Sequence, residues 1–143
     1  MMPAKTRRIF KSRRSRYPRT RSATGMKLPQ LLLVDDDVSI LEISARLLGS
    51  RWQVQTAKSA EEAEDILQSR CFDVVLTDYN MTGQNGIWLL GRAARRYPRM
   101  RRVLYSGCRP GDLCLHLESG LIHSFVSKPA SRDSLIASLE PRH

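Results

Sequence analysis

The sequence predicts an α/β fold in which a doubly wound, five-stranded parallel sheet is flanked by five helices. Two observations lead to this prediction. Between residues 27 and 139, five short runs of apolar and β-branched residues alternate with five stretches of helical periodicity, a pattern that favours parallel strands joined by right-handed crossovers. In addition, polar residues that caps and turns do not explain follow directly after the strand-like runs, where the carboxyl ends of parallel strands meet.

The positive charge of the chain is confined to its first residues. The 143 residues carry a formal net charge of +10, and residues 1–25 contain nine Lys or Arg and no acid. Fifteen bases against fourteen acids remain, so residues 26–143 carry only +1. If residues 1–25 belong to the native product, we expect a disordered basic arm that binds nucleic acid weakly and without sequence preference. Because Met26 begins a domain-like segment, we favour a native product that starts there.

Composition excludes several classes of protein for the domain at residues 26–143. No run of eighteen apolar residues occurs, so we expect no membrane span. Cys71, Cys108 and Cys114 are an odd number without a C-x-x-C pair, which argues against a disulfide framework and a zinc site. We expect buried or half-buried thiols in a cytoplasmic protein.

The first predicted strand, residues 31–34, is apolar throughout, which indicates burial on both faces of the sheet. Three consecutive acids follow it at 35–37, and they repel one another unless a positive group lies nearby. Asp37 or Ser39 can cap the next helix, which has one apolar face, and Gly49 is typical of a helix end. Capping therefore explains one acid and leaves two.

The other elements follow from the same patterns. The remaining predicted strands cover residues 52–56, 74–76, 103–105 and 122–126, and the remaining predicted helices cover 60–68, 86–97, 112–119 and 131–139. Ser59 and Glu62 form a capping box at the second helix. Residues 112–119 are ambiguous, because Leu113, Leu115 and Leu117 alternate as in a strand while Leu113, Cys114, Leu117 and Leu121 have the spacing of a helix. Asp112 as a helix N-cap and Gly120 as a stop favour the helix.

Five polar residues lie at the carboxyl ends of strands one, three, four and five, and the fold gathers them at one edge: Asp35, Asp36, Asp78, Ser106 and Lys128. Carboxylates without softer ligands suit a hard cation such as Mg²⁺, which also cancels their repulsion. A lysine and a hydroxyl opposite them are suited to holding a phosphoryl group. Together these groups indicate phosphoryl transfer onto Asp78 as the nucleophile.

Residues 27–139 resemble a two-component response-regulator receiver domain, which has a flavodoxin-like fold. The resemblance rests on the segments LLLVDDD, VVLTDYNM with Gly86 beyond it, LYSG and FVSKP, in this order and at the family's spacing. It implies that Asp78 accepts a phosphoryl group from the phosphohistidine of a histidine kinase or phosphotransfer protein. The signal then passes to an unknown downstream protein by a change in partner binding.

The resemblance also implies roles for individual residues. Asp36, Asp78 and the backbone carbonyl of Asn80 bind Mg²⁺ directly, while Asp35 helps through water. Ser106 is the switch hydroxyl and Lys128 the phosphate-binding base, followed by Pro129 in a cis peptide bond. Phe125 is the switch aromatic, although an ordinary core role remains the alternative for an aromatic residue on this strand.

The chain departs from the family at a few places. Thr82 stands where Pro usually follows Met81, and we expect this change to loosen the loop without touching a ligand. The sequence ends after a short last helix, which predicts a stand-alone receiver. His116 and His123 match no motif and are expected to be surface or packing residues. The alternatives are an interaction scaffold that does not depend on phosphorylation, and an aspartyl phosphatase, which Asn80 disfavours because that class has an acid at this position.

Overall fold

The computed structural model describes residues 27–141, and the predicted basic arm at 1–25 lies outside this range. The strands are β1 (Gln30–Val34), β2 (Gln53–Ala57), β3 (Val74–Thr77), β4 (Arg101–Ser106) and β5 (Ser124–Ser127). The helices are α2 (Val38–Leu48), α3 (Ala60–Ser69), α4 (Gly86–Arg96), α5 (Leu113–Ser119) and α6 (Arg132–Leu139). The predicted fold class, five parallel strands with five helices, is therefore confirmed.

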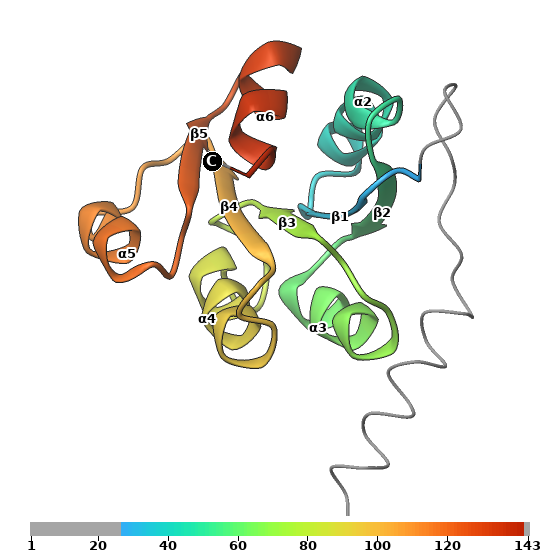
Figure 1. Ribbon diagram of the computed structural model, residues 1–143. Coiled ribbons are helices and arrows are strands. Elements are labelled where there is room, and N and C mark those ends of the chain that lie inside the picture. Colours follow the sequence, from blue (N-terminus) through green and yellow to red (C-terminus); the bar gives the residue numbers. More distant parts are fainter. Residues whose placement is uncertain (1–26, 142–143) are drawn as a thin grey trace, which may run out of the picture.

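The strands form one parallel sheet in the order β2-β1-β3-β4-β5, with helices on both faces (Figure 1). Leu31 and Leu33 of β1 belong to a core cluster with α2 and α6, whereas Leu32 and Val34 belong to a cluster with α3 and α4. Successive side chains of a strand point to opposite faces, so a strand covered on both sides needs an uninterrupted apolar run. The two-sided core explains why the first predicted strand shows no alternation.

Capping residues fix where most helices begin. Asp37, Ser59, Asn85 and Ser131 each accept a hydrogen bond from a backbone N–H two or three residues later. The predicted capping box is only half formed. Ser59 accepts from the Glu62 N–H, but Glu62 accepts from the N–H of Lys58 at 2.7 Å and not from that of Ser59. Asp112 was expected to cap α5, but its side chain makes no cap hydrogen bond and instead contacts His116 Nε2 at 3.0 Å.

Glycines end two helices in different ways. Gly120 has φ of 84°, the left-handed conformation that glycine adopts most easily, and ends α5 as expected. Gly49 follows α2 in right-handed helical geometry with φ of −67°, so its predicted place is correct but the left-handed stop is not formed.

Burial differs from expectation for the cysteines, and α5 buries little of its apolar surface. Of the four residues whose spacing fits a helix here, only Leu113 is buried, while Cys114 and Leu117 are exposed and Leu121 is half-buried. The neighbouring Leu115 is 66% exposed. Cys108 is also exposed and only Cys71 is half-buried, so two of the three thiols face solvent. Among the described residues, no helix is long and apolar enough to cross a membrane.

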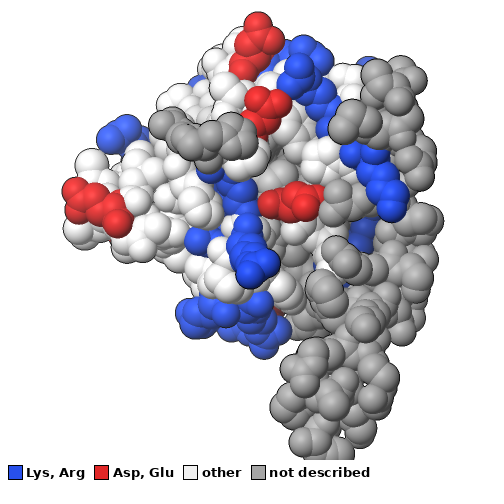
Figure 2. Space-filling model, viewed as in Figure 1, with Lys and Arg blue, Asp and Glu red and all other residues white. Residues whose placement is uncertain are grey.

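Arginine and lysine side chains gather over α4 in the view of Figure 2. The last turn of this helix carries Arg95 and Arg96, both exposed. Cations near a helix C-terminus interact favourably with the partial negative charge there. A local basic surface therefore exists on a domain whose net charge is close to zero.

Candidate functional site

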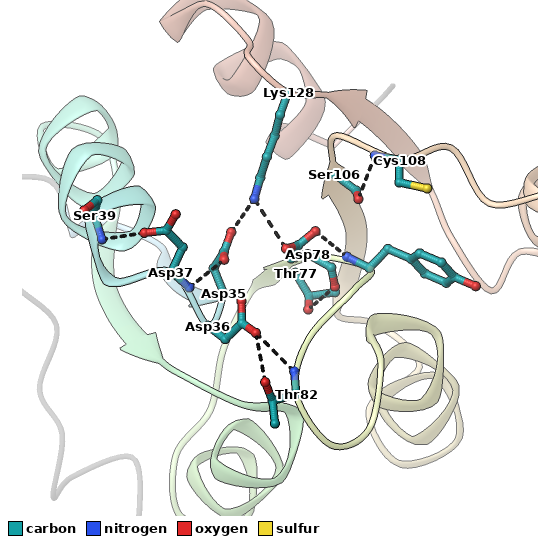
Figure 3. A network of polar contacts seen from close by, with 11 residues as sticks. Asp35, Asp36, Asp37, Ser39, Thr77, Asp78, Thr82, Ser106, Cys108 and Lys128 are labelled. Atoms are coloured by element: carbon teal, nitrogen blue, oxygen red, sulfur yellow. Dashed lines mark hydrogen bonds and ion pairs between the residues drawn. The ribbon is translucent and has the colours of Figure 1, made fainter.

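Three carboxylates meet at the carboxyl edge of the sheet. Asp35 and Asp36 follow β1, Asp78 follows β3, and these two strands are neighbours. One oxygen from each carboxylate lies within 4.8 Å of the others (Figure 3). Asp35 is buried, Asp78 is half-buried and Asp36 is exposed, so the cluster opens to solvent on one side. The sequence prediction that these three acids come together is confirmed.

Lys128 extends from the end of β5 into the same cluster. Its Nζ lies 2.5 Å from Asp35 Oδ2 and 3.5 Å from Asp78 Oδ2, and 5.2 Å from the centre of the Tyr105 ring. β5 is the outermost strand, so this side chain reaches across β4 to contact residues that follow β3 and β1. Lys128 is therefore the positive group that the run of acids required.

Burial and charge act in opposite directions on the Lys128–Asp35 pair. Burial by itself lowers the pKa of Lys128, but the hydrogen bond to Asp35 and the charges of Asp35 and Asp78 outweigh it and raise this pKa. Burial raises the pKa of Asp35 more than its contacts with Lys128 and the Asp37 N–H lower it. The ammonium is therefore stabilised by two acids, whereas Asp35 is desolvated and shares its only lysine with Asp78.

Backbone contacts hold Asp78 in place. Its N–H donates to the Val34 carbonyl at 2.9 Å, and its Oδ1 accepts from the Tyr79 N–H at 2.7 Å. Gly86, at the start of α4, lies so close that an added Cβ would be 2.1 Å from the Asp78 carbonyl oxygen. Glycine is therefore required at this position, which explains the glycine that follows the VVLTDYNM segment.

Thr82 contacts the acidic cluster, contrary to the sequence prediction. Its N–H donates to Asp36 Oδ2 at 3.1 Å, and its hydroxyl lies 3.5 Å from the same oxygen. The next part of the loop is held from another side, where the Gln84 N–H donates to Glu61 Oε2 at 3.2 Å. Sequence reasoning missed both contacts, because they depend on loop conformation and backbone donors that no side-chain pattern reveals.

The other predicted residues lie around the cluster. Ser106 ends β4, is 2% exposed, and its Oγ accepts from the Cys108 N–H at 3.2 Å (Figure 3). Phe125 on β5 is half-buried against the core cluster of α3 and α4. Asn80 is exposed in the loop after β3. The peptide bond between Lys128 and Pro129 is cis, as expected.

The donor set of this edge suits a hard divalent cation. The side-chain donors of the cluster are carboxylate oxygens, and the cluster is open to solvent on one side, as a cation that retains several waters requires. The half-buried carboxylate of Asp78 and the ammonium of Lys128 lie 3.5 Å apart at this edge, and the buried hydroxyl of Ser106 ends the neighbouring strand β4.

Comparison with known proteins is consistent with this geometry. The family model of the response regulator receiver domain matches residues 31–140. The chain belongs to this family. As a receiver domain it is a module of two-component systems, and it is 32% identical over 114 residues to the alginate biosynthesis transcriptional regulatory protein AlgB of Pseudomonas aeruginosa. That match covers 78% of this chain and 25% of AlgB.

Further relatives of this receiver domain give the same result. It is 30% identical over 111 residues to the hydrogenase transcriptional regulatory protein HoxA of Cupriavidus necator, covering 77% of this chain and 23% of HoxA. The chain thus spans about a quarter of the curated relatives that it matches. The signal receiver domain of an HD domain-containing protein from Pseudomonas fluorescens superposes with a TM-score of 0.73 at 30% identity. That superposition covers 79% of this chain and 92% of the other.

Proposed function

We propose that this receiver domain accepts a phosphoryl group on Asp78 and signals through a resulting change in the partners it binds. The observation that carries the proposal is the placement of Asp78 at the centre of the carboxyl edge, between the acids after β1 and the lysine after β5. The donor would be the phosphohistidine of a histidine kinase or phosphotransfer protein in the cytoplasm.

Three residues of the chain act directly in the transfer. The N–P bond of the phosphohistidine breaks as a carboxylate oxygen of Asp78 forms the new O–P bond, which gives an acyl phosphate. Lys128, now divided between Asp35 and Asp78, pairs with the phosphoryl oxygens as a point charge. The hydroxyl oxygen of Ser106 accepts a hydrogen bond from the backbone N–H of Cys108, and the Ser106 O–H is able to donate to a phosphoryl oxygen.

The acids hold the cation that the family implies. Asp36, Asp78 and the Asn80 carbonyl would bind Mg²⁺ directly, and Asp35 would contact it through water. When bound, Mg²⁺ supplies positive charge that offsets the carboxylates and the incoming phosphoryl oxygens. Each oxygen of Asp35 already has one partner, Lys128 Nζ or the Asp37 N–H, which supports the indirect role.

Phosphorylation adds up to two negative charges beside Lys128 and Ser106, and we expect it to bias a two-state equilibrium. Ser106 would move toward the phosphoryl oxygens and Phe125 would turn inward. This change would reshape the surface formed by α5, β5 and α6, which is where a downstream partner would distinguish the two states.

Intact mass measurement tests the assignment of Asp78. Incubation with Mg²⁺ and acetyl phosphate is expected to add the mass of one phosphoryl group to the native protein and none to Asp78→Asn. Asp65→Asn is the matched control, because it neutralises an exposed acid on α3 away from the cluster. A gain of mass that persists in Asp78→Asn, or its absence from the native protein, contradicts the proposal.

A further inference from the structure

The loop after β3 is tied to the acidic cluster by a backbone amide of residue 82. This amide lies 3.1 Å from Asp36 Oδ2, within the normal range for an N–H···O hydrogen bond. The Thr82 hydroxyl oxygen lies 3.5 Å from the same carboxylate oxygen, a distance longer than that of a normal O–H···O hydrogen bond. The backbone N–H therefore contributes most of the interaction. Every residue except proline supplies that donor.

The contact with Thr82 occupies one carboxylate oxygen of Asp36 and leaves the other oxygen available to a cation. Both contacts from Thr82 are to Oδ2, and in Figure 3 the second oxygen lies on the side of Asp35 and Asp78. Asp36 is exposed, so without a partner its side chain samples several rotamers. A hydrogen bond to a charged acceptor fixes one of them and removes this entropy cost from the binding step.

We propose that Thr82 is a positioning residue that holds Asp36 in the orientation needed to bind a divalent cation. This inference rests on the proposal that Asp36 and Asp78 bind Mg²⁺, and it adds a residue that the family pattern does not supply. Where proline occupies the position, the donor is missing and the carboxylate has to be ordered in another way. The substitution of Pro by Thr therefore tightens this site, which is the opposite of the loosening expected from the sequence.

Calorimetric titration with MgCl₂ tests the proposal on variants of one residue. Thr82→Pro removes the N–H and should weaken Mg²⁺ binding about tenfold, the lower end of the loss typical for groups that orient metal ligands. Thr82→Ser and Thr82→Ala retain the N–H and should keep the native affinity. If Ala weakens binding as much as Pro does, the amide does not carry the effect and the proposal is wrong.

Glu61→Ala separates positioning of Asp36 from general order of the loop. It removes the hydrogen bond to the Gln84 N–H and leaves the contact between Thr82 and Asp36. We expect Glu61→Ala to bind Mg²⁺ much like the native protein. A loss equal to that of Thr82→Pro would instead assign the effect to the loop and overturn the proposal.

Amide hydrogen exchange gives a measurement that does not depend on the proline variant folding. The Thr82 amide should exchange slowly in the metal-free native protein and faster in Asp36→Ala, and it should stay protected when MgCl₂ is added. Loss of protection on adding Mg²⁺ would mean that the cation displaces Thr82, which contradicts positioning. Failure of the native protein to bind Mg²⁺ would refute the proposed function and this inference together, whereas equal affinity of native and Thr82→Pro refutes only the inference.

Discussion

His123 joins the loop before β5 to the start of β4 through two hydrogen bonds. The Nδ1 of its side chain accepts from the Arg102 backbone N–H at 2.8 Å. The backbone N–H of His123 donates to the Arg102 carbonyl, also at 2.8 Å. The imidazole therefore carries its proton on Nε2 when neutral. Partial burial of the ring lowers the pKa of His123, and the positive charges of Arg102 and Arg101 lower it further. Protonation at Nδ1 would end the first hydrogen bond.

This lowered pKa predicts a pH dependence of stability. Below the unfolded-state pKa of about 6.5, the unfolded chain binds a proton that the folded chain resists. The contribution of His123 to the free energy of unfolding is therefore complete above that pH and is lost as pH falls through the folded-state pKa. His123→Asn keeps an acceptor near Nδ1 but does not titrate. In urea denaturation, the free energy of unfolding should fall less between pH 7.5 and pH 5 for the variant than for the native protein. An equal fall for both proteins would contradict this assignment.

The sequence could predict the positions of residues that follow a strand, but not the contacts made by loop residues. Asp35, Asp36, Asp78, Ser106 and Lys128 were predictable because the end of a strand fixes where the next side chain lies. The contact between Thr82 and Asp36 was not, since it joins a loop amide to a carboxylate forty-six residues earlier. The surface or packing role expected for His123 is consistent with its place.

The turn from β3 into α4 is the element on which the position of Asp78 depends. The Gly86 N–H donates to the Tyr79 carbonyl at 2.9 Å, and Asn85 caps the helix through the Trp88 N–H at 2.9 Å. The backbone thus folds back on itself within a few residues of Asp78, and the missing side chain of Gly86 makes that approach possible.

Gly86→Ala should therefore disturb both the helix start and Asp78. Its Cβ would meet a backbone oxygen that cannot rotate away, so we expect a loss of about 2–4 kcal/mol in the free energy of unfolding. Gly91→Ala is the matched control on the same helix. The nearest atom to its added Cβ is 3.9 Å away, and alanine should stabilise α4 by up to about 1 kcal/mol. Thermal denaturation of both variants tests this contrast, and similar melting temperatures for them would contradict it.

Element types were easier to predict than the faces that elements bury. All five strands and five helices lie where periodicity placed them, with ends shifted by a few residues. The buried side of α5 could not be predicted, because Leu113, Cys114, Leu115 and Leu117 surround a short helix and their spacing does not single out one side. The helix lies beside the outermost strand β5 (Figure 1), where the sheet covers less of it.

At the scale of the whole domain, the side chain of Arg102 links the start of β4 to two loops by hydrogen bonds. It is 6% exposed, and burial lowers its pKa. Its guanidinium donates to four backbone carbonyls, those of Pro98 at 3.3 Å and of Met100, Gly120 and Leu121 at 2.9 Å. The loops before β4 and after α5 are therefore held by one side chain, at the opposite edge of the sheet from the acidic cluster.

Arg102→Lys should destabilise the whole domain although it preserves the charge. An ammonium has neither the planar fork nor the reach to satisfy four carbonyls, and unsatisfied buried acceptors cost free energy. We expect the free energy of unfolding to fall by about 2–4 kcal/mol in urea denaturation. Arg95→Lys, at an exposed position of α4, is the control and should change it by less than about 0.5 kcal/mol. A similar small change for Arg102→Lys would show that the carbonyls find other donors.

The pairing of β1 with β3 also decides at what stage of folding the acidic cluster can exist. Leu31 pairs with Val54 on one side and with Val74 on the other, and the second partner lies almost twice as far along the chain. Asp36 and Asp78 are consequently far apart in a nascent or partly folded chain until that longer loop closes. A cation that bridges them binds the native chain in preference to the unfolded one, so its presence would shift the folding equilibrium toward the native state by mass action.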